Sequence, residues 1–340
     1  MTRIAVVGGG AWGTALADLL ARKGDTVTLW AREPEVVDAV NRQHSNPIFL
    51  PGAALAPALR AEGDLGAAVR DAEVVVSAAP AHAVRPVMTQ AAAAFPRKGE
   101  QPLVVSVSKG LDPEGLERPS SVLAAVLPRG TPVAVLSGPS FAQEVYERQP
   151  TAVVAAAQDH AVAQRAQRVF SASHFRVYSH TDVVGVELGG ALKNVIALAA
   201  GILEGLGLGF NTRAAVITRG LAEITRLGVA LGADAMTFAG LAGMGDLILT
   251  ATGALSRNRS LGVALGQGQT FEQAQAGKAT VAEGVNTART AVALGARHGV
   301  ELPIAREVAE VLFKGKAPRQ AVTDLMERDL KPEQWGGGGR

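Results

Sequence analysis

Apolar runs of strand length alternate with helix-like segments through the first half of the chain. The first run, residues 4–7, passes into glycines, and apolar residues then recur at helical spacing over residues 15–21. Continuous Val-rich runs separated by helices are typical of parallel strands that are covered on both faces. The pattern therefore predicts an α/β fold with a parallel sheet. Further runs of this kind predict strands at residues 25–31, 73–79, 103–108, 133–136, 153–156 and 175–178.

The pattern changes near residue 182. Beyond that point the chain shows helical periodicity and no convincing strand, with Pro303 suited to a helix start and Gly315 to a helix stop. We therefore expect a first domain over residues 1–181, an all-α domain over 182–330 and a flexible tail over 331–340, with the ligand in the cleft between the domains. The candidate helices cover residues 183–206, 212–232, 256–267, 284–299, 303–314 and 318–327.

The glycines that follow the first strand have the spacing G-x-G-x-x-G, formed by Gly8, Gly10 and Gly13. The first glycine permits a tight turn, the second lets the backbone approach a pyrophosphate, and the third lets the helix pack close to the sheet. The anion would lie on unpaired N–H groups at the helix N-terminus, where the helix dipole also favours negative charge. The alternative is a glycine-rich turn that binds nothing. Because strand, glycines and helix occur together, we favour a dinucleotide site.

The second predicted strand ends at Arg32, 19 residues beyond Gly13. An acidic residue near this position selects NAD through the ribose 2′-hydroxyl, whereas an arginine accommodates the 2′-phosphate of NADP. Arg32 therefore indicates NADP, with an ordinary exposed loop arginine as the alternative. Glu33 keeps NAD open, because a one-residue shift in the turn would present its carboxylate. We expect NADPH to be preferred and NADH to be accepted.

Composition limits the function classes. The 340 residues are 48% hydrophobic and 19% charged, which suits a sizeable core, and a net charge of +2 indicates no nucleic-acid partner. The absence of cysteine excludes disulfides, thiolate metal sites and cysteine nucleophiles, and no His/Asp/Glu cluster suggests a metal. No signal peptide is visible, and no uninterrupted apolar stretch reaches the roughly 20 residues of a membrane span. We expect a cytoplasmic protein without a membrane span, and the apolar helical domain favours a homodimer.

Two lysines stand where a charge is costly. Lys109 follows an apolar strand, at the edge of the sheet where ligands bind, and Lys193 lies inside an otherwise apolar helix. A buried lysine must pair, titrate or hold a ligand, and Lys193 has Glu187 or Asp246 as candidate partners. Asp246 is either a helix N-cap or the partner of a lysine. Residues 256–259 offer hydroxyl, guanidinium and amide donors suited to a phosphate, or are a helix start with surface arginines.

Five segments occur together along the chain, namely GGGAWGTA at residues 8–15, SKGL at 108–111, LSGPSFA at 136–142, GGALKNV at 189–195 and SRNR at 256–259. In this combination the chain resembles the bacterial NAD(P)-dependent glycerol-3-phosphate dehydrogenases, from about residue 3 to about residue 328. The resemblance implies an N-terminal Rossmann-like dinucleotide-binding domain followed by an all-α substrate domain. It also implies NAD(P)H-dependent reduction of dihydroxyacetone phosphate to sn-glycerol 3-phosphate, the precursor of the phospholipid backbone.

The resemblance also implies site residues. Lys193 matches the proton-transfer lysine of the family, and Lys109 and Asp246 complete the expected catalytic set. Ala11 is often serine in the family, so we expect backbone N–H groups to replace one side-chain hydrogen bond to phosphate. The positions expected to contact substrate are Lys109, Gly138, Ser140, Lys193, Asn194, Asp246, Thr250, Ser256, Arg257 and Asn258. The positions expected to contact the cofactor are Gly8, Gly10, Ala11, Trp12, Gly13, Arg32, Lys109, Ala142, Arg257, Val281 and Glu283.

The expected chemistry needs a proton donor. Hydride addition to the ketone carbon leaves an alkoxide, and a lysine with its ordinary pKa of about 10.4 is already in the acid form at neutral pH. We therefore expect Lys193 to act without extensive tuning of its pKa, kept charged by Asp246, while Arg257 anchors the phosphate. Two alternatives are a related dehydrogenase that acts on another three-carbon or 2-hydroxy-acid substrate, and a dinucleotide-sensing protein without turnover.

Overall fold

The computed structural model describes residues 1–96, 99–276, 282–330 and 333 of the chain. The chain divides into two compact units. The sheet unit consists of Met1–Ser108 and Arg118–Val183, and the helical unit consists of Lys109–Glu117 and the chain from Val184 onward. The segment Lys109–Glu117, which follows closely on a strand of the sheet, is therefore grouped with the helices.

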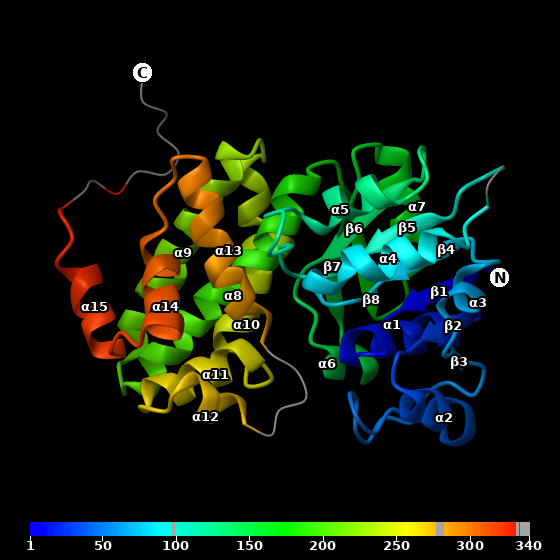
Figure 1. Ribbon diagram of the computed structural model, residues 1–340, viewed down its shortest axis with the longest axis horizontal. Helices are drawn as coiled ribbons and strands as arrows, with labels where there is room; N and C mark the ends of the chain where they lie inside the picture. The colour runs from blue at the N-terminus through cyan, green and yellow to red at the C-terminus, as the bar shows by residue number, and fades with distance from the viewer. Residues whose placement is uncertain (97–98, 277–281, 331–332, 334–340) are drawn as a thin grey trace. The chain divides into compact units, whose positions relative to one another are not determined.

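The sheet unit is built on one eight-stranded sheet in the order β3-β2-β1-β4-β5-β6-β7-β8 (Figure 1). The strands from β1 to β6 are parallel, and the predicted α/β fold is confirmed. Strand β7 pairs antiparallel with β6 and parallel with β8. The strands are β1 (Arg3–Val7), β2 (Thr26–Trp30), β3 (Arg60–Glu62), β4 (Val74–Ser77), β5 (Leu103–Ser106), β6 (Val133–Ser137), β7 (Thr151–Ala156) and β8 (Phe175–His180).

Two features of this sheet differ from the sequence-based expectation. The connection from β6 to β7, residues 138–150, contains only the five-residue helix α6 (Ala142–Tyr146), and β7 enters the sheet at the edge where β6 ends. Strands β7 and β8 therefore run against the other six, because a parallel neighbour would need a full crossover across the sheet. Strand β3 was not expected, since three residues with polar ends give no apolar run.

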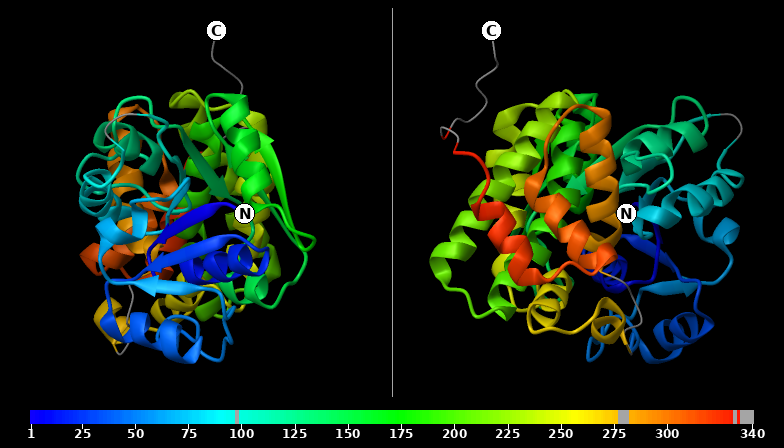
Figure 2. Two further views of the ribbon diagram at one scale, coloured as in Figure 1. Left: turned by 90° about the vertical axis from the view of Figure 1, so that its right-hand side faces the viewer. Right: turned by 60° about the vertical axis from the view of Figure 1, so that its left-hand side comes forward.

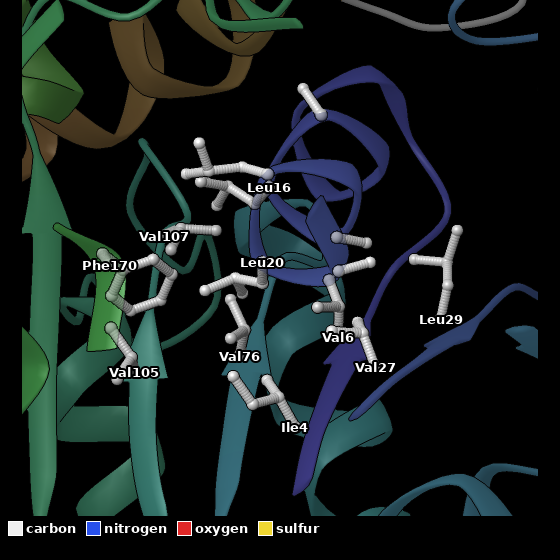
Figure 3. Packing of buried hydrophobic residues seen from close by; sticks show 14 of the residues in the cluster. Ile4, Val6, Leu16, Leu20, Val27, Leu29, Val76, Val105, Val107 and Phe170 are labelled. Atoms are coloured by element: carbon white, nitrogen blue, oxygen red, sulfur yellow. The ribbon is translucent and has the colours of Figure 1, made fainter. Parts of the chain in front are cut away.

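Both faces of the sheet are covered. On one face, Ile4 and Val6 of β1 pack with Leu16 and Leu20 of α1 (Ala11–Arg22) and, farther along the sheet, the cluster reaches Phe170 (Figure 3). The opposite face carries a separate cluster of valines with α3, α4 and α5. Burial on both faces explains why the strands are almost continuously apolar. The other helices of this unit are α2 (Pro34–Gln43), α3 (Leu65–Val69), η1 (Ala81–Ala83), α4 (Val84–Ala92), α5 (Pro119–Val126) and α7 (His160–Phe170).

The helical unit is organised around α8 (Val183–Gly205) (Figure 1). Every residue of this helix from Gly185 to Leu203 is buried. A helix that is apolar on all sides is expected in the core of a helical domain. By length and hydropathy α8 would also suffice to cross a membrane, but 94% of its most apolar window is buried inside the protein, as for a core helix.

Helices α8 and α11 (Arg257–Gly266) meet through glycines. A Cβ added at Gly201 or Gly205 of α8 would lie 2.1 Å or 2.2 Å from a carbonyl oxygen of α11. A Cβ added at Gly262 or Gly266 of α11 would lie 2.2 Å or 2.3 Å from a carbonyl oxygen of α8. The two helix backbones are therefore in direct contact, which no side chain larger than hydrogen would permit.

The described part of the chain beyond residue 182 contains no strand, as predicted. The short segments between Asp234 and Gly253 and around Phe271 were not predicted, because five to seven residues give little periodicity. Helices α13 and α14 lie side by side (Figure 2), and α14 begins at Pro303 and ends before Gly315 as expected. The remaining elements are α9 (Phe210–Ala230), η2 (Ala235–Ala239), η3 (Leu241–Gly245), α10 (Asp246–Thr252), α12 (Phe271–Gln275), α13 (Glu283–Arg297), α14 (Pro303–Lys314) and α15 (Pro318–Met326).

Candidate active site

The glycine-rich loop between β1 and α1 has the geometry of a phosphate-binding turn. Gly8 has φ +132°, and a Cβ at Gly13 would lie 2.0 Å from the carbonyl oxygen of Gly8, so this helix start lies directly on the turn. At Gly10 an added Cβ would meet no atom within 4 Å. The loop is thus closed on the side of the sheet and open at Gly10, where the backbone can approach a ligand.

The first turn of α1 completes this cradle. Helix α1 begins at Ala11 and carries no acidic side chain in its first turn, so its N–H groups and dipole are available to an anion. The Nε1 of Trp12 is buried and has no hydrogen-bond partner among the described residues. An open glycine and an N-terminus without a competing carboxylate fit the pyrophosphate of a dinucleotide. Ala11 offers no hydroxyl, which leaves the backbone N–H groups to bind it.

The end of β2 presents both candidate selectivity residues. The Nη2 of Arg32 lies 3.0 Å from Oε1 of Glu33, and the arginine side chain is 84% exposed against 29% for the glutamate. The guanidinium of Arg32 is therefore exposed to solvent while it forms an ion pair with the carboxylate of Glu33. An exposed arginine at this position suits a 2′-phosphate, while the adjacent carboxylate competes for the same guanidinium.

The predicted strand-end residues of β6 also lie in the sheet unit. Gly138 has φ +138°, and the hydroxyl of Ser140 donates to the carbonyl oxygen of Gly138 at 2.9 Å. Ala142 is the first residue of α6. These residues form a turn at the carboxyl end of a parallel strand, the edge at which such sheets bind ligands.

In the helical unit, one carboxylate joins two lysines. Asp246 is 0% exposed, and its Oδ2 accepts from Nζ of Lys109 at 2.9 Å while its Oδ1 accepts from Nζ of Lys193. Lys193 Nζ also donates to the hydroxyl of Thr250 at 2.8 Å. Of the two expected partners of Lys193, Asp246 is therefore confirmed. Asp246 is the first residue of α10, whose N-cap is Gly245, so the N-cap role considered for it is not observed.

A distorted helix segment places Asp246. Leu241–Gly245 forms one turn of π-helix directly before α10, and π-turns occur often at functional sites. This turn lies against α8, where a Cβ at Gly189 would be 2.5 Å from the carbonyl oxygen of Ala242. Gly189 is one turn before Lys193, so the close approach brings Asp246 to the lysine. This turn is not among the predicted elements, and the glycine cluster before Asp246 is the one signal for it in the sequence.

Burial changes the acidity of Lys193. The side chain is 7% exposed, and burial lowers the pKa of Lys193 to about 7. The positive charge of Lys109 lowers this pKa further, and the negative charge of Asp246 raises it. The expectation of an ordinary lysine pKa is therefore wrong, because loss of hydration outweighs the carboxylate. A group with a pKa near the working pH can both donate and accept a proton.

Two buried asparagines connect the lysines to α11. Asn194 donates from Nδ2 to the carbonyl oxygen of Lys109 at 3.1 Å and accepts at Oδ1 from Nδ2 of Asn258 at 2.9 Å. The Oδ1 of Asn258 accepts from the N–H of Gly284 at 2.9 Å. Gly284 follows Glu283, the first residue of α13 and a predicted cofactor contact. The amides therefore hold α8, α11 and α13 in fixed register around Lys109.

The first residues of α11 include two whose side chains have structural partners and one that is exposed. Ser256 is the N-cap and accepts from the N–H of Arg259 at 3.2 Å. Arg259 forms two bonds to Glu204, at 2.6 Å and 2.9 Å, which commits that guanidinium to an ion pair. Arg257 is exposed at the helix N-terminus. The segment is therefore a capped helix start that also offers donors suited to an anion.

Six predicted residues lie close together in the helical unit. The glycine loop and the Gly138 turn belong to the sheet unit. Val281, a predicted cofactor contact, lies outside the described residues, as does the predicted tail apart from Glu333. No group of three metal-ligating side chains occurs among the described residues. The six are Lys109, Lys193, Asn194, Asp246, Thr250 and Asn258.

The sheet unit carries a dinucleotide-binding loop, and the helical unit carries a buried lysine of lowered pKa beside a carboxylate. These features define the class of nucleotide-dependent oxidoreductases in which a lysine is the general acid. Residues 3–163 match the model of the NAD-dependent glycerol-3-phosphate dehydrogenase N-terminus, and residues 182–323 match that of the C-terminus. The chain belongs to the NAD-dependent glycerol-3-phosphate dehydrogenase family.

Relatives of known name support this assignment. The chain is 54% identical over 335 residues to a glycerol-3-phosphate dehydrogenase [NAD(P)+] of Geobacter sulfurreducens, covering 98% of this chain and 99% of the relative. It is 53% identical over 333 residues to the protein of that name from Geobacter sp. strain M21, covering 97% and 98%. The crystal structure of glycerol-3-phosphate dehydrogenase from Coxiella burnetii matches with a TM-score of 0.91 at 39% identity, covering 96% of this chain and 99% of that one.

Proposed function

We propose that the chain catalyses the reversible reduction of dihydroxyacetone phosphate to sn-glycerol 3-phosphate with NADPH or NADH, and so supplies glycerophospholipid synthesis. Relatives covering nearly the whole chain carry the name of this enzyme. The observation that carries the proposal is the buried amine of Lys193, with a pKa of about 7 and a carboxylate attached. A sensor without turnover has no need of such a proton donor.

The proposed roles follow from the contacts in the helical unit. The reduced nicotinamide would supply the hydride that adds to the ketone carbon. As hydride adds to the carbon, the π electrons of C=O move to the oxygen, and Lys193 donates its Nζ proton to that developing alkoxide while Asp246 holds the amine in place. Lys109, on the other oxygen of Asp246, adds a second positive charge that favours an anionic substrate. Running in reverse, neutral Lys193 accepts the proton of the alcohol.

The substrate would be anchored at its phosphate. We propose that Arg257, at the N-terminus of α11, binds this group together with the helix dipole. For Ser256 and Asn258 we propose support of the same helix start, since their side chains already bond within the protein. From the family resemblance we further propose that Gly138 and Ser140 contact substrate, and that Glu283 and Ala142 contact the cofactor.

Turnover of dihydroxyacetone phosphate tests this function. Oxidation of NADPH is followed with the wild-type protein, with Lys193→Ala and with Lys316→Ala. Lys316 is the control, because it is likewise a lysine held by carboxylate partners, Glu307 and Asp324, but has no proposed role in the reaction. We expect Lys193→Ala to lower kcat by about 10²- to 10⁴-fold and Lys316→Ala to leave it within about twofold. Equal turnover in the two variants would contradict the role of Lys193.

A substrate panel separates this enzyme from a related dehydrogenase with another substrate. Dihydroxyacetone, which lacks the phosphate, and 2-keto acids are compared with dihydroxyacetone phosphate. We expect the phosphate-free ketone to be reduced with kcat/KM lower by at least about 10³-fold, because the anchoring energy is lost. Arg257→Ala should raise KM for the phosphate ester and leave the weak reaction of dihydroxyacetone unchanged. Preference for a 2-keto acid would favour the alternative dehydrogenase.

We propose that NADPH is preferred over NADH. The proposal rests on Arg32, whose exposed guanidinium suits the 2′-phosphate, while Glu33 beside it explains use of NADH. The ratio of kcat/KM for the two cofactors is measured in the wild type and in Arg32→Ala. We expect the variant to lose NADPH activity by about 10-fold and to keep NADH activity. A wild-type preference for NADH would refute the assignment.

We also propose a homodimer, a cytoplasmic location and domains over residues 1–181 and 182–330. Large apolar side chains that are exposed on the helical unit, namely Phe210 at 81% and Met236 at 73%, support a subunit interface there. Sedimentation equilibrium measures the assembly state directly. A single species at the monomer mass across micromolar concentrations would exclude the dimer.

A further inference from the structure

A loop behind the glycine-rich turn carries a fully buried asparagine. Helix α2 ends at Gln43, and its C-cap residue His44 has φ +50°. The loop that follows closes on itself where the N–H of Leu55 donates to the carbonyl oxygen of His44 at 2.7 Å. Asn46, within this loop, is 0% exposed. A buried amide is costly unless it is hydrogen-bonded, so its partners indicate what the loop holds.

The partners of Asn46 are the glycine turn and the helix that follows it. Its Nδ2 donates to the carbonyl oxygen of Gly9 and to the hydroxyl of Thr14, each at 2.8 Å. Its Oδ1 accepts from the N–H of Phe49 at 3.1 Å. Thr14 in turn donates from its hydroxyl to the carbonyl oxygen of Gly9 at 3.2 Å. The carbonyl oxygen of Gly9 therefore accepts hydrogen bonds from two side chains, those of Asn46 and Thr14.

This clamp sets the direction of one peptide group. In a planar trans peptide, the C=O of Gly9 and the N–H of Gly10 point in opposite directions. Because Asn46 and Thr14 draw the carbonyl into the protein, the N–H of Gly10 points away from them. Gly10 is the position where an added side chain would meet no atom within 4 Å. The clamp therefore directs the N–H of Gly10 away from Asn46 and Thr14, at a residue whose Cα is not crowded by other atoms.

A clamp is useful here because three successive glycines have little conformational preference of their own. Gly8, Gly9 and Gly10 lose more backbone freedom on ordering than any other residues, and the Gly9–Gly10 peptide could otherwise rotate. Fixing the donor before the ligand arrives removes an ordering cost from binding. We infer that Asn46, with Thr14, is a positioning residue for the pyrophosphate of the dinucleotide, acting through the Gly9–Gly10 peptide. The inference rests on the proposed nucleotide-dependent function.

Binding measurements test this role without requiring turnover. Affinities for NADPH and for adenosine 2′-phosphate, which lacks the pyrophosphate, are measured by calorimetry on the full chain. We expect Asn46→Ala to weaken NADPH binding by about 10- to 100-fold and to change binding of adenosine 2′-phosphate by less than twofold. Equal weakening of both ligands, or no weakening of NADPH, would overturn the inference.

Three further variants separate positioning from general stability. Thr14→Val keeps the side-chain volume and removes the hydroxyl donor, so it should weaken NADPH binding in the same direction, and Thr14→Ser should restore it. Asn41→Ala is the matched control, because Asn41 also bonds a backbone carbonyl and N–H, both of Ala61 at 2.9 Å in the edge strand β3, and not the glycine loop. It should lower the thermal midpoint and leave NADPH affinity unchanged. Loss of NADPH affinity in Asn41→Ala would show that the weaker binding of Asn46→Ala comes from lowered stability, and would overturn the inference.

Steady-state kinetics supply the last readout. In Thr14→Val, KM for NADPH should rise while kcat at saturating NADPH and KM for dihydroxyacetone phosphate stay within about twofold. A parallel fall in kcat would refute a positioning role confined to the nucleotide. If the wild type binds NADPH but reduces no phosphorylated ketone, the proposed reaction fails and the binding comparison still decides the role of Asn46.

Discussion

The pH dependence of dihydroxyacetone phosphate reduction follows from the lowered pKa of Lys193. The forward reaction needs the ammonium form, which is lost as the pH rises through about 7. About nine-tenths of the amines are protonated at pH 6 and about one-tenth at pH 8, so the reduction kcat should fall about tenfold between these values. Oxidation of glycerol 3-phosphate needs the neutral amine and should rise by a similar factor. A lysine with an ordinary pKa of 10.5 would leave the reduction unchanged over this range.

Two variants should move this profile in opposite directions. Thr250→Val removes an acceptor 2.8 Å from Nζ of Lys193, so the ammonium loses about 1 kcal/mol of stabilisation and the profile should shift to lower pH by roughly 0.5 to 1 unit. Lys109→Met removes a neighbouring positive charge that lowers the pKa, so its profile should shift to higher pH.

The assay is the initial rate of NADPH oxidation in buffers of constant ionic strength from pH 6 to 9. kcat at saturation is the quantity to compare, because the substrate phosphate has its own pKa near 6 and would distort kcat/KM. A reduction kcat that is flat to pH 9 would refute the proton-donor role at this pKa. Identical profiles in Thr250→Val, Lys109→Met and the wild type would show that another group sets the profile.

Two more predictions concern the helical unit. Gly201→Ala would place a Cβ 2.1 Å from the carbonyl oxygen of Arg259, so α11 must move by about 1 Å and kcat/KM should fall by about 10²-fold. Gly209→Ala is the control, because a Cβ there meets no atom within 4 Å and kcat/KM should stay unchanged. Equal activities of the two variants would show that the helix contact has no effect on the site. Burial raises the pKa of Glu223 to about 7, so the folded state binds more protons than the unfolded state between pH 4.5 and 7 and stability falls as the pH rises there. Glu223→Gln should remove this slope, up to about 1 kcal/mol per pH unit, in denaturant titrations at pH 5, 6 and 7, and an unchanged slope would contradict the assignment.

Much of the fold was predictable because it depends on local patterns. Val-rich runs located seven of the strands, and the glycine spacing located the first helix. The direction of β7 was not predictable, since it depends on how the β6–β7 connection returns to the sheet rather than on the residues of the strand. Short elements such as β3 and α10 were also missed, because they are held by tertiary contacts and not by their own periodicity.

The site was predictable in its residue types and less so in its chemistry. A lysine in an apolar helix required a partner, and the sequence offered Asp246, 53 positions away, as one of two candidates. The acidity of Lys193 depends on how completely the surrounding helices exclude water, which no sequence pattern reports. Likewise, Asn46 lies in an irregular loop and gave no signal, because its role arises from contact with a backbone carbonyl 37 positions earlier.

Lys193 and Asn194 stand in the middle of α8, where every neighbouring position of the same helix is enclosed by the rest of its unit. Damage to that interior anywhere along the helix will therefore reach the reaction. On heating, loss of turnover and loss of far-ultraviolet helix signal should coincide in a single curve, so that an enzyme assay also reports how many molecules are folded. In a random-mutagenesis screen for lost activity, substitutions that weaken core packing would then be found as often as substitutions of catalytic residues.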